Sequence, residues 1–171
     1  MGGVESYFSG MSNAKAMSGG QYFKGEGKFK LRTKRFFVND GHKGKFFIAE
    51  FEVLESSTTT DPKGATRSWA VPLEGSRAKY SFGDIKNLVF AICGQNPKDV
   101  GDPSENPKLH QEATQQVMAA CDAEYAKKNN VDPTDLIDQE VSLETFLKAT
   151  KPKEGQTQGG TFTVHNWGPA E

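Results

Sequence analysis

Alternation of apolar and polar side chains dominates the chain from residue 27 onward. Over residues 27–38, Phe29 and Leu31 fall on one side of an extended segment, and basic side chains fall on the other: Lys28, Lys30, Arg32 and Lys34. Successive side chains of a strand point to opposite faces, so this pattern predicts a first strand with one apolar and one cationic face.

A second strand is predicted over residues 45–55, after a turn in which Asp40-Gly41 permits positive φ. Its apolar row is Phe47, Ala49, Phe51 and Val53. Phe46 belongs to the opposite row and is expected beside the cationic face of the first strand. Residues 66–73 predict a third strand, which follows a polar turn containing Pro62 and Gly64.

Helical periodicity appears only after the third strand. Apolar residues at i, i+3, i+4 and i+7 predict an amphipathic helix with Asp84 as N-cap and Gly94 as stop: Ile85, Leu88, Val89 and Ile92. A second, continuous helix is predicted over residues 108–129, with its apolar face along Ala113, Val117, Cys121 and Tyr125. Alternation returns over residues 140–150 and 161–167, which predict a fourth and a fifth strand joined by a flexible loop.

This order of elements is that of the OB-fold, a five-stranded Greek-key barrel. The barrel binds oligonucleotides or oligosaccharides on its strands 2 and 3 and its 1-2 and 4-5 loops. The sequence therefore predicts a mainly β, OB-fold domain over residues 21–169, with a helical insert at about 82–130 between strands 3 and 4. Residues 1–20 predict a flexible N-terminal arm. Five-stranded β-sandwiches and SH3-like barrels are alternatives.

Composition favours one intracellular domain. The chain has 171 residues, 35% of them hydrophobic, including twelve Phe, which is enough for one core. It has neither an apolar stretch of about twenty residues nor a secretory signal pattern, so we expect no membrane partner and a cytoplasmic protein. Cys93 and Cys121 lack CxxC spacing, which favours buried thiols over a disulfide or a zinc site.

The net charge of −1 hides an asymmetry along the chain. Residues 1–80 hold 13 basic and 8 acidic side chains, whereas residues 81–140 hold 5 and 11. Binding to phosphates responds to the local field rather than to the total charge. A basic, strand-rich part on a nearly neutral protein is therefore compatible with a nucleic-acid partner.

Several short segments, taken in order, resemble the bacteriophage single-stranded DNA-binding proteins that are built on one OB barrel. The segments are residues 25–28, 47–56, 67–69, 83–86 and the closing 161–167. The resemblance implies sequence-tolerant binding of exposed DNA during phage replication, recombination or repair, in the cytoplasm of the host cell. It also implies phage replication or recombination proteins as possible partners.

One departure from this family concerns partner recruitment. Many such proteins end in an acidic tail, whereas this chain ends in Trp-Gly-Pro-Ala-Glu. We therefore do not expect recruitment through a tail, and the acidic helical insert is a hypothetical partner surface instead. The sequence leaves monomer and homodimer both open.

Binding a single strand without reading its sequence requires cations along the phosphates and flat rings on which bases stack. Besides the four basic residues of the first strand, we predict phosphate contacts from Lys43, Lys45, Arg67, Lys148, Lys151 and Lys153. Phe46 and Trp69 are the preferred stacking candidates, and Phe36, Phe37, Phe146 and Trp167 are lesser ones. Core packing is predicted instead for Phe29, Phe47, Phe51 and Phe162.

Enzymatic and metal-dependent functions are not predicted, and no cofactor is expected. His42, His110 and His165 lie in unrelated contexts without metal-ligand spacing. The acidic group Asp135, Asp138 and Glu140 is interpreted as a turn before the fourth strand. The alternative function is an OB-type protein-interaction module, such as an inhibitor of a host enzyme, and oligosaccharide binding is a third possibility that rests on the fold alone.

Overall fold

A computed structural model describes residues 22–23, 26–41, 44–149, 152, 155 and 160–170. Within these residues the chain is mainly β, with one antiparallel sheet of five strands in the order β3-β2-β1-β4-β5. The strands are β1 (Gly27–Gly41), β2 (Gly44–Ser56), β3 (Thr66–Pro72), β4 (Glu140–Ala149) and β5 (Thr161–Pro169). Between β3 and β4 lie α2 (Ala78–Ile92), the 3-10 helix η3 (Pro97–Asp99), α3 (Pro107–Cys121) and α4 (Ala123–Asn129).

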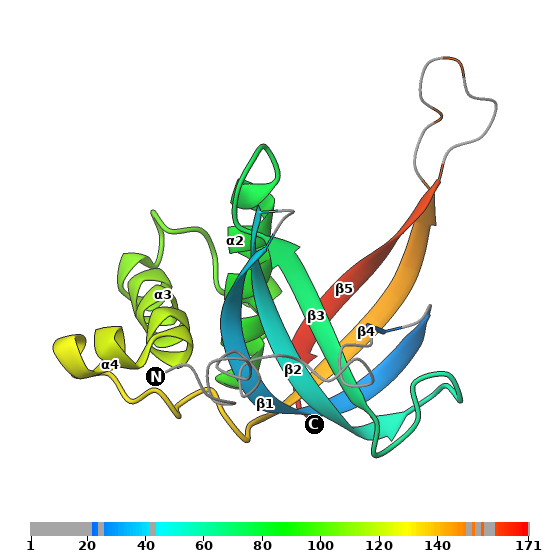
Figure 1. Cartoon of the computed structure of the whole chain (residues 1–171), viewed down its shortest axis with the longest axis horizontal. Helices are drawn as coiled ribbons and strands as arrows, with labels where there is room; N and C mark the ends of the chain where they lie inside the picture. Colours follow the sequence, from blue (N-terminus) through cyan, green and yellow to red (C-terminus); the bar gives the residue numbers. More distant parts are fainter. Residues whose placement is uncertain are drawn as a thin grey trace, which may run out of the picture.

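The five predicted strands and the helical insert are therefore confirmed, but the sheet is not closed. β3 and β5 are its two edges, and no backbone ladder joins them within the described residues. Helix α2 packs against β5, β3 and β4 at this open side. In Figure 1 the far ends of β4 and β5 extend away from α3 and α4, which lie at the opposite side of the molecule. The predicted arm at residues 1–20 falls outside the described residues.

Strand β1 is bent by two register shifts, one at Lys30/Leu31 and one at Thr33/Arg35. A bulge bends a strand and strengthens its twist. β1 consequently pairs with β2 from Phe29 to Gly41 but with β4 only from Gly27 to Arg32. This bend curls the single sheet around one hydrophobic core.

Thr33 fixes the second bend. Its side chain is fully buried, and its Oγ1 donates to the backbone oxygen of Leu136 at 2.6 Å and accepts from the backbone N–H of Gln139 at 3.0 Å. Thr33→Val keeps the side-chain shape but removes the hydrogen bonds to the buried backbone oxygen of Leu136 and to the partly buried N–H of Gln139, so we expect the free energy of unfolding to fall by about 1–3 kcal/mol. Urea unfolding measures this loss. Thr66→Val, at an exposed position of β3, is the control and should change little.

The core lies between the inward rows of the sheet and α2. Phe47, Phe51 and Leu31 are fully buried and meet Leu88 and Val89 of the helix in one apolar cluster. Just upstream of β1, Phe23 is also buried, 5.1 Å from Phe29 between ring centroids, and Tyr22 forms a parallel bridge with Ser68 on the edge of β3. These contacts confirm that the apolar rows predicted for the first two strands face inward.

The helix boundaries correct two predictions. α2 begins at Ala78 and not after Asp84, because the turn at Gly75 leads directly into a first helical turn in which Ser81 is buried and bonds to Arg77. The predicted second helix is two helices, since Asp122 is extended and its carboxylate accepts from two backbone N–H groups of α4.

The thiols also differ from the prediction of buried cysteines. Cys93 is exposed because it lies at the C-cap of α2, where the helix ends, and Cys121 is half-buried.

Candidate nucleic-acid interface

The basic face predicted for β1 is present as a row of side chains. Lys28 and Lys34 are exposed, Lys30 and Arg32 are half-buried, and Phe29 and Leu31 between them are buried. The alternation of β1 is therefore confirmed as far as Thr33. After the bulge the phase changes, so that Arg35 is exposed as well and its guanidinium lies 4.3 Å from the centre of the Phe37 ring.

Carboxylates from neighbouring strands neutralise much of this face. Lys30 Nζ lies 3.6 Å from Glu140 Oε1, and Lys34 Nζ lies 3.4 Å from both Glu52 Oε2 and Asp138 Oδ1. Lys28 is directly opposite Glu144 in the β1–β4 register. The first-strand cations therefore do not form a continuous positive track. Acidic side chains from other segments of the chain lie beside them in the folded protein.

The prediction that Arg67 contacts a phosphate is wrong, because its side chain is buried. The side chain points inward from β3 and is 8% exposed, and its Nε donates to Oδ1 of the fully buried Asp61 at 2.5 Å. Its Nη2 donates to the backbone oxygen of Thr60 and its Nη1 to that of Thr66, both at 2.9 Å. Arg67 thus holds the β2–β3 connection against the sheet.

The two tryptophans and Phe36 also lie in the core, contrary to the prediction that they stack on bases. Trp69 is 4% exposed and Trp167 is 6% exposed, with their ring centroids 5.2 Å apart in an edge-on contact. Phe51 stacks on Trp167 at 5.3 Å, and Phe36 stacks on Phe47 at 5.8 Å. Because Trp69 shares the inward row of β3 with Val71, its ring packs across the open side of the sheet, where it joins β3 to β5.

Other aromatic candidates keep accessible rings. Phe37, Phe46 and Phe146 are half-buried on the outer face of the sheet. Phe162 was predicted to be core, but it is 45% exposed, because its part of the β4–β5 hairpin extends beyond the core. Phe162 is directly opposite Lys148, which is exposed.

One of the four remaining predicted cations falls within the described residues. Lys45 is exposed at the start of β2, opposite Asp40. Lys43, Lys151 and Lys153 lie outside the described residues.

A cleft runs along the open side of the sheet, between the β3 edge, the β5 edge and the first turns of α2. This seam cleft has a volume of about 460 Å³. Tyr80, at its rim, is 67% exposed, with Lys79 Nζ 5.1 Å from the centre of its ring. The lining residues are Trp69, Ala70, Val71, Pro72, Arg77, Tyr80, Ser81, Asp84, Phe162, Thr163, Val164 and His165.

Sequence reasoning missed this cleft, because it identified neither Arg77 nor Tyr80. Both belong to the first turns of α2, which lie before the start predicted from Asp84. Tyr80 directly after the cations Arg77 and Lys79 was the available signal. Burial raises the pKa of the Asp84 carboxyl in the same cleft, so a negative charge is less favourable there than in water.

His165 lies on β5 between the two tryptophans. Its ring centroid is 6.1 Å from that of Trp69 and 6.3 Å from that of Trp167, to which it is nearly parallel at 16°. Burial lowers the pKa of His165 from 6.5 to about 4, because the charged imidazolium is poorly solvated there. The ring is therefore neutral at physiological pH and presents a flat, uncharged surface.

This pKa predicts a pH dependence of folding. Unfolded chains bind a proton at His165 near pH 6.5 and the folded protein only near pH 4, so the stability is complete above pH 6.5 and is lost as the pH falls toward 4. We expect this loss to reach about 3 kcal/mol. Denaturant unfolding of the wild type and of His165→Gln at pH 7.5 and pH 4.5 measures it. The variant should lose less stability on acidification, and an equal loss in both proteins would contradict the assignment.

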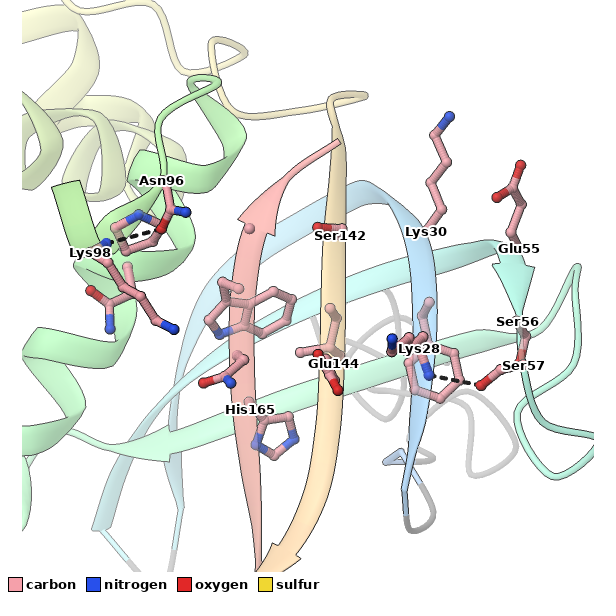
Figure 2. Close-up of a pocket in the computed structure, with 17 residues that line it drawn as sticks. Lys28, Lys30, Glu55, Ser56, Ser57, Asn96, Lys98, Ser142, Glu144 and His165 are labelled. Atoms are coloured by element: carbon pink, nitrogen blue, oxygen red, sulfur yellow. Dashed lines mark hydrogen bonds between the residues drawn. The ribbon is translucent and has the colours of Figure 1, made fainter. Parts of the chain in front are cut away.

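A second cavity, the polar groove, crosses β1, β4 and β5 and has a volume of about 680 Å³. Figure 2 shows Asn96 and Lys98 at one side of it and Lys28, Lys30 and Glu55 at the other, with β5 and β4 between them. The remaining lining residues are Phe29, Ser56, Ser57, Asn87, Pro97, Ser142, Leu143, Glu144, His165, Asn166, Trp167 and Gly168. His165 lines both cavities, so the polar groove and the seam cleft meet the same residue of β5.

The described residues show no arrangement suited to a metal ion, since no three His, Cys, Asp or Glu side chains come together in them. Of the acidic group before β4, Asp138 and Glu140 are salt-bridged to lysines of β1. In the same part of the chain, none of the helices is long and apolar enough to cross a membrane.

Comparison with known proteins does not assign a family. No protein-family model matches the chain, and no curated protein is significantly similar to it. Any function must therefore be argued from the geometry of the two cavities.

Proposed function

We propose that this protein is an OB-type barrel that binds single-stranded DNA with little dependence on sequence, and that the strand lies in the seam cleft. An OB-fold is a five-stranded, partly open Greek-key barrel. A five-stranded antiparallel sheet with an open side, and with helices between β3 and β4, supports that assignment. Residues 162–165 of β5, which follow the 4-5 loop that binds ligands in OB-folds, also line the cleft.

One observation carries the proposal: accessible aromatic rings and cations lie together around the seam cleft. Tyr80 and Phe162 are both exposed at its rim, and Arg77 lines it. Lys79 beside the Tyr80 ring and Lys148 opposite Phe162 add two positive charges. Stacked bases and neutralised phosphates are the two interactions that sequence-tolerant binding of a single strand requires.

The cleft differs from the β1 face in its charge. Among the described residues that line the cleft, Asp84 is the one carboxylate. On the β1 face, in contrast, Lys30 and Lys34 are already salt-bridged. A phosphate therefore meets less acidic competition in the cleft, which supports moving the binding surface from β1 to the β3–β5 edge.

A fluorescence titration tests the proposal. The two tryptophans line the two cavities, so a pyrimidine oligonucleotide of about thirty bases should change their emission, and the matching duplex should not. The logarithm of the affinity should fall linearly with the logarithm of the salt concentration, because binding releases counterions from the phosphates. Absence of binding to the single strand at low salt would refute the proposal.

A protein-interaction module, such as an inhibitor of a host enzyme, is the second candidate. The alternating charges of the β1 face favour it, since mixed charge gives a protein partner specificity but offers little to a polyanion. The dependence of the binding affinity on salt concentration distinguishes the two functions. A largely apolar protein interface should weaken only slightly between low and high salt, whereas phosphate binding should weaken steeply.

In biological terms, we propose that the protein coats and protects exposed single strands during phage DNA replication, recombination or repair. Its protein partners would then be other components of those reactions. The exposed carboxylates of α3 and α4 are the surface that we would test first for such partners, by charge reversal of Glu112 and Glu124.

A further inference from the structure

Trp167 carries a hydrogen-bond donor without a partner. Within the described residues, its Nε1 is the single buried side-chain nitrogen or oxygen that makes no hydrogen bond. Leaving a buried donor unpaired costs about 1–3 kcal/mol, so such a group in a folded protein calls for an explanation. Trp167 also lines the polar groove, which makes a ligand that supplies an acceptor one explanation.

The polar groove does not select for an anion. Lys28, Lys30 and Lys98 line it, but so do Glu55 and Glu144. Lys30 is in addition salt-bridged to Glu140. The charges of the groove and its rim therefore balance, and a phosphate would gain little there.

Neutral hydrogen-bonding groups make up much of the remaining lining. Asn87, Asn96 and Asn166 present side-chain amides, and Asn96 Oδ1 is held by the backbone N–H of Lys98 at 3.1 Å. At Gly168 the groove has no side chain, and an added Cβ would lie 3.0 Å from Ser142 Oγ. Amides pair with the donors and acceptors on nucleobase edges, and unstacked bases of a single strand expose those edges.

We propose that the polar groove binds one nucleobase of the single strand, and that a carbonyl oxygen of this base accepts a hydrogen bond from Trp167 Nε1. The inference rests on the proposed function, because it extends the strand from the seam cleft past His165, which lines both cavities. The neutral ring of His165 offers the base a stacking surface. Trp167 Nε1 is not itself exposed, so the groove-lining side chains rearrange as the base enters.

The proposal predicts a base preference. Thymine, cytosine and guanine carry a carbonyl oxygen, whereas adenine does not. A net hydrogen bond contributes about 0.5–1.5 kcal/mol, so an oligothymidine should bind about 2- to 10-fold more tightly than an oligoadenosine of the same length.

NMR of the indole groups provides the decisive measurement. The chain has two tryptophans, so a ¹⁵N–¹H spectrum holds two indole signals, which Trp69→Phe assigns. Saturation with oligothymidine should move the Trp167 indole proton downfield and slow its exchange with water, and oligoadenosine should do so less. If the oligonucleotide binds but the Trp167 signal keeps its position and exchange rate, the inference is overturned.

A pair of variants separates this inference from the proposed function. Trp167→Phe, which removes the Nε1 donor, should remove most of the preference for oligothymidine, whereas Asn129→Ala, at an exposed position of α4, should preserve it. Failure of every oligonucleotide to bind the wild type would overturn the proposed function together with the inference. Binding with equal affinity for both oligonucleotides would overturn the inference alone.

Discussion

Replacing Arg67 with alanine should lower the free energy of unfolding by about 3–5 kcal/mol, because it removes the guanidinium that pairs with the fully buried carboxylate of Asp61. The same substitution also removes the donors to the backbone oxygens of Thr60 and Thr66. The β2–β3 connection should consequently loosen. Chemical denaturation monitored by circular dichroism measures the loss of stability.

Two further variants define the origin of this effect. Lys34→Ala breaks exposed ion pairs with Glu52 and Asp138 and should cost less than about 1 kcal/mol. Arg67→Met combined with Asp61→Leu replaces both charges by apolar groups and should recover much of the stability lost in Arg67→Ala. If Arg67→Ala were as mild as Lys34→Ala, the pair would not be buried in solution, and Arg67 would again be a candidate for phosphate binding.

Replacing both Tyr80 and Phe162 with alanine should weaken binding to single-stranded DNA by about 2–6 kcal/mol, which is roughly 30-fold or more. Both rings are exposed at the rim of the seam cleft, and each offers a stacking surface for one base. The folded state should be affected little, because neither ring belongs to the core. Fluorescence titration at one fixed salt concentration measures the affinity.

Phe82→Ala is the matched control for this pair. Phe82 is also exposed and also belongs to α2, but it does not line the seam cleft. Its removal should leave the affinity within about 2-fold of the wild type. A loss at Phe82 equal to that of the double variant would place the strand elsewhere, and full affinity in the double variant would exclude the cleft.

The strands were predictable because each depends on a local pattern. Phe29 and Leu31 alternate with lysines, and a period of two assigns them to opposite faces whatever the rest of the fold does. The same parity puts Arg67, Trp69 and Val71 on one face. The parity does not say which face points into the core. The inward position of Arg67 depends on its ion pair with the buried Asp61, which the alternation does not reveal.

The candidate site was less predictable, since it depends on which segments meet in space. Glu140 and Asp138 are more than a hundred residues from the lysines that they neutralise. Glu140 reaches Lys30 across the β1–β4 ladder, and Asp138 reaches Lys34 from the connection just before β4. The start of α2 at Ala78 was not predicted, for a different reason. Asp84 is a strong local capping signal, but the packing of Ser81 against the core extends the helix beyond it.

The open side of the sheet has a consequence for how DNA is loaded. β3 and β5 meet through aromatic side chains such as Trp69 and Trp167, and no backbone ladder closes the ring of described strands. Under the proposed function, a strand can be laid into the seam cleft from the side and need not be threaded through a closed ring. A covalently closed circle has no ends to thread, and this protein should capture it as rapidly as a linear strand of the same length.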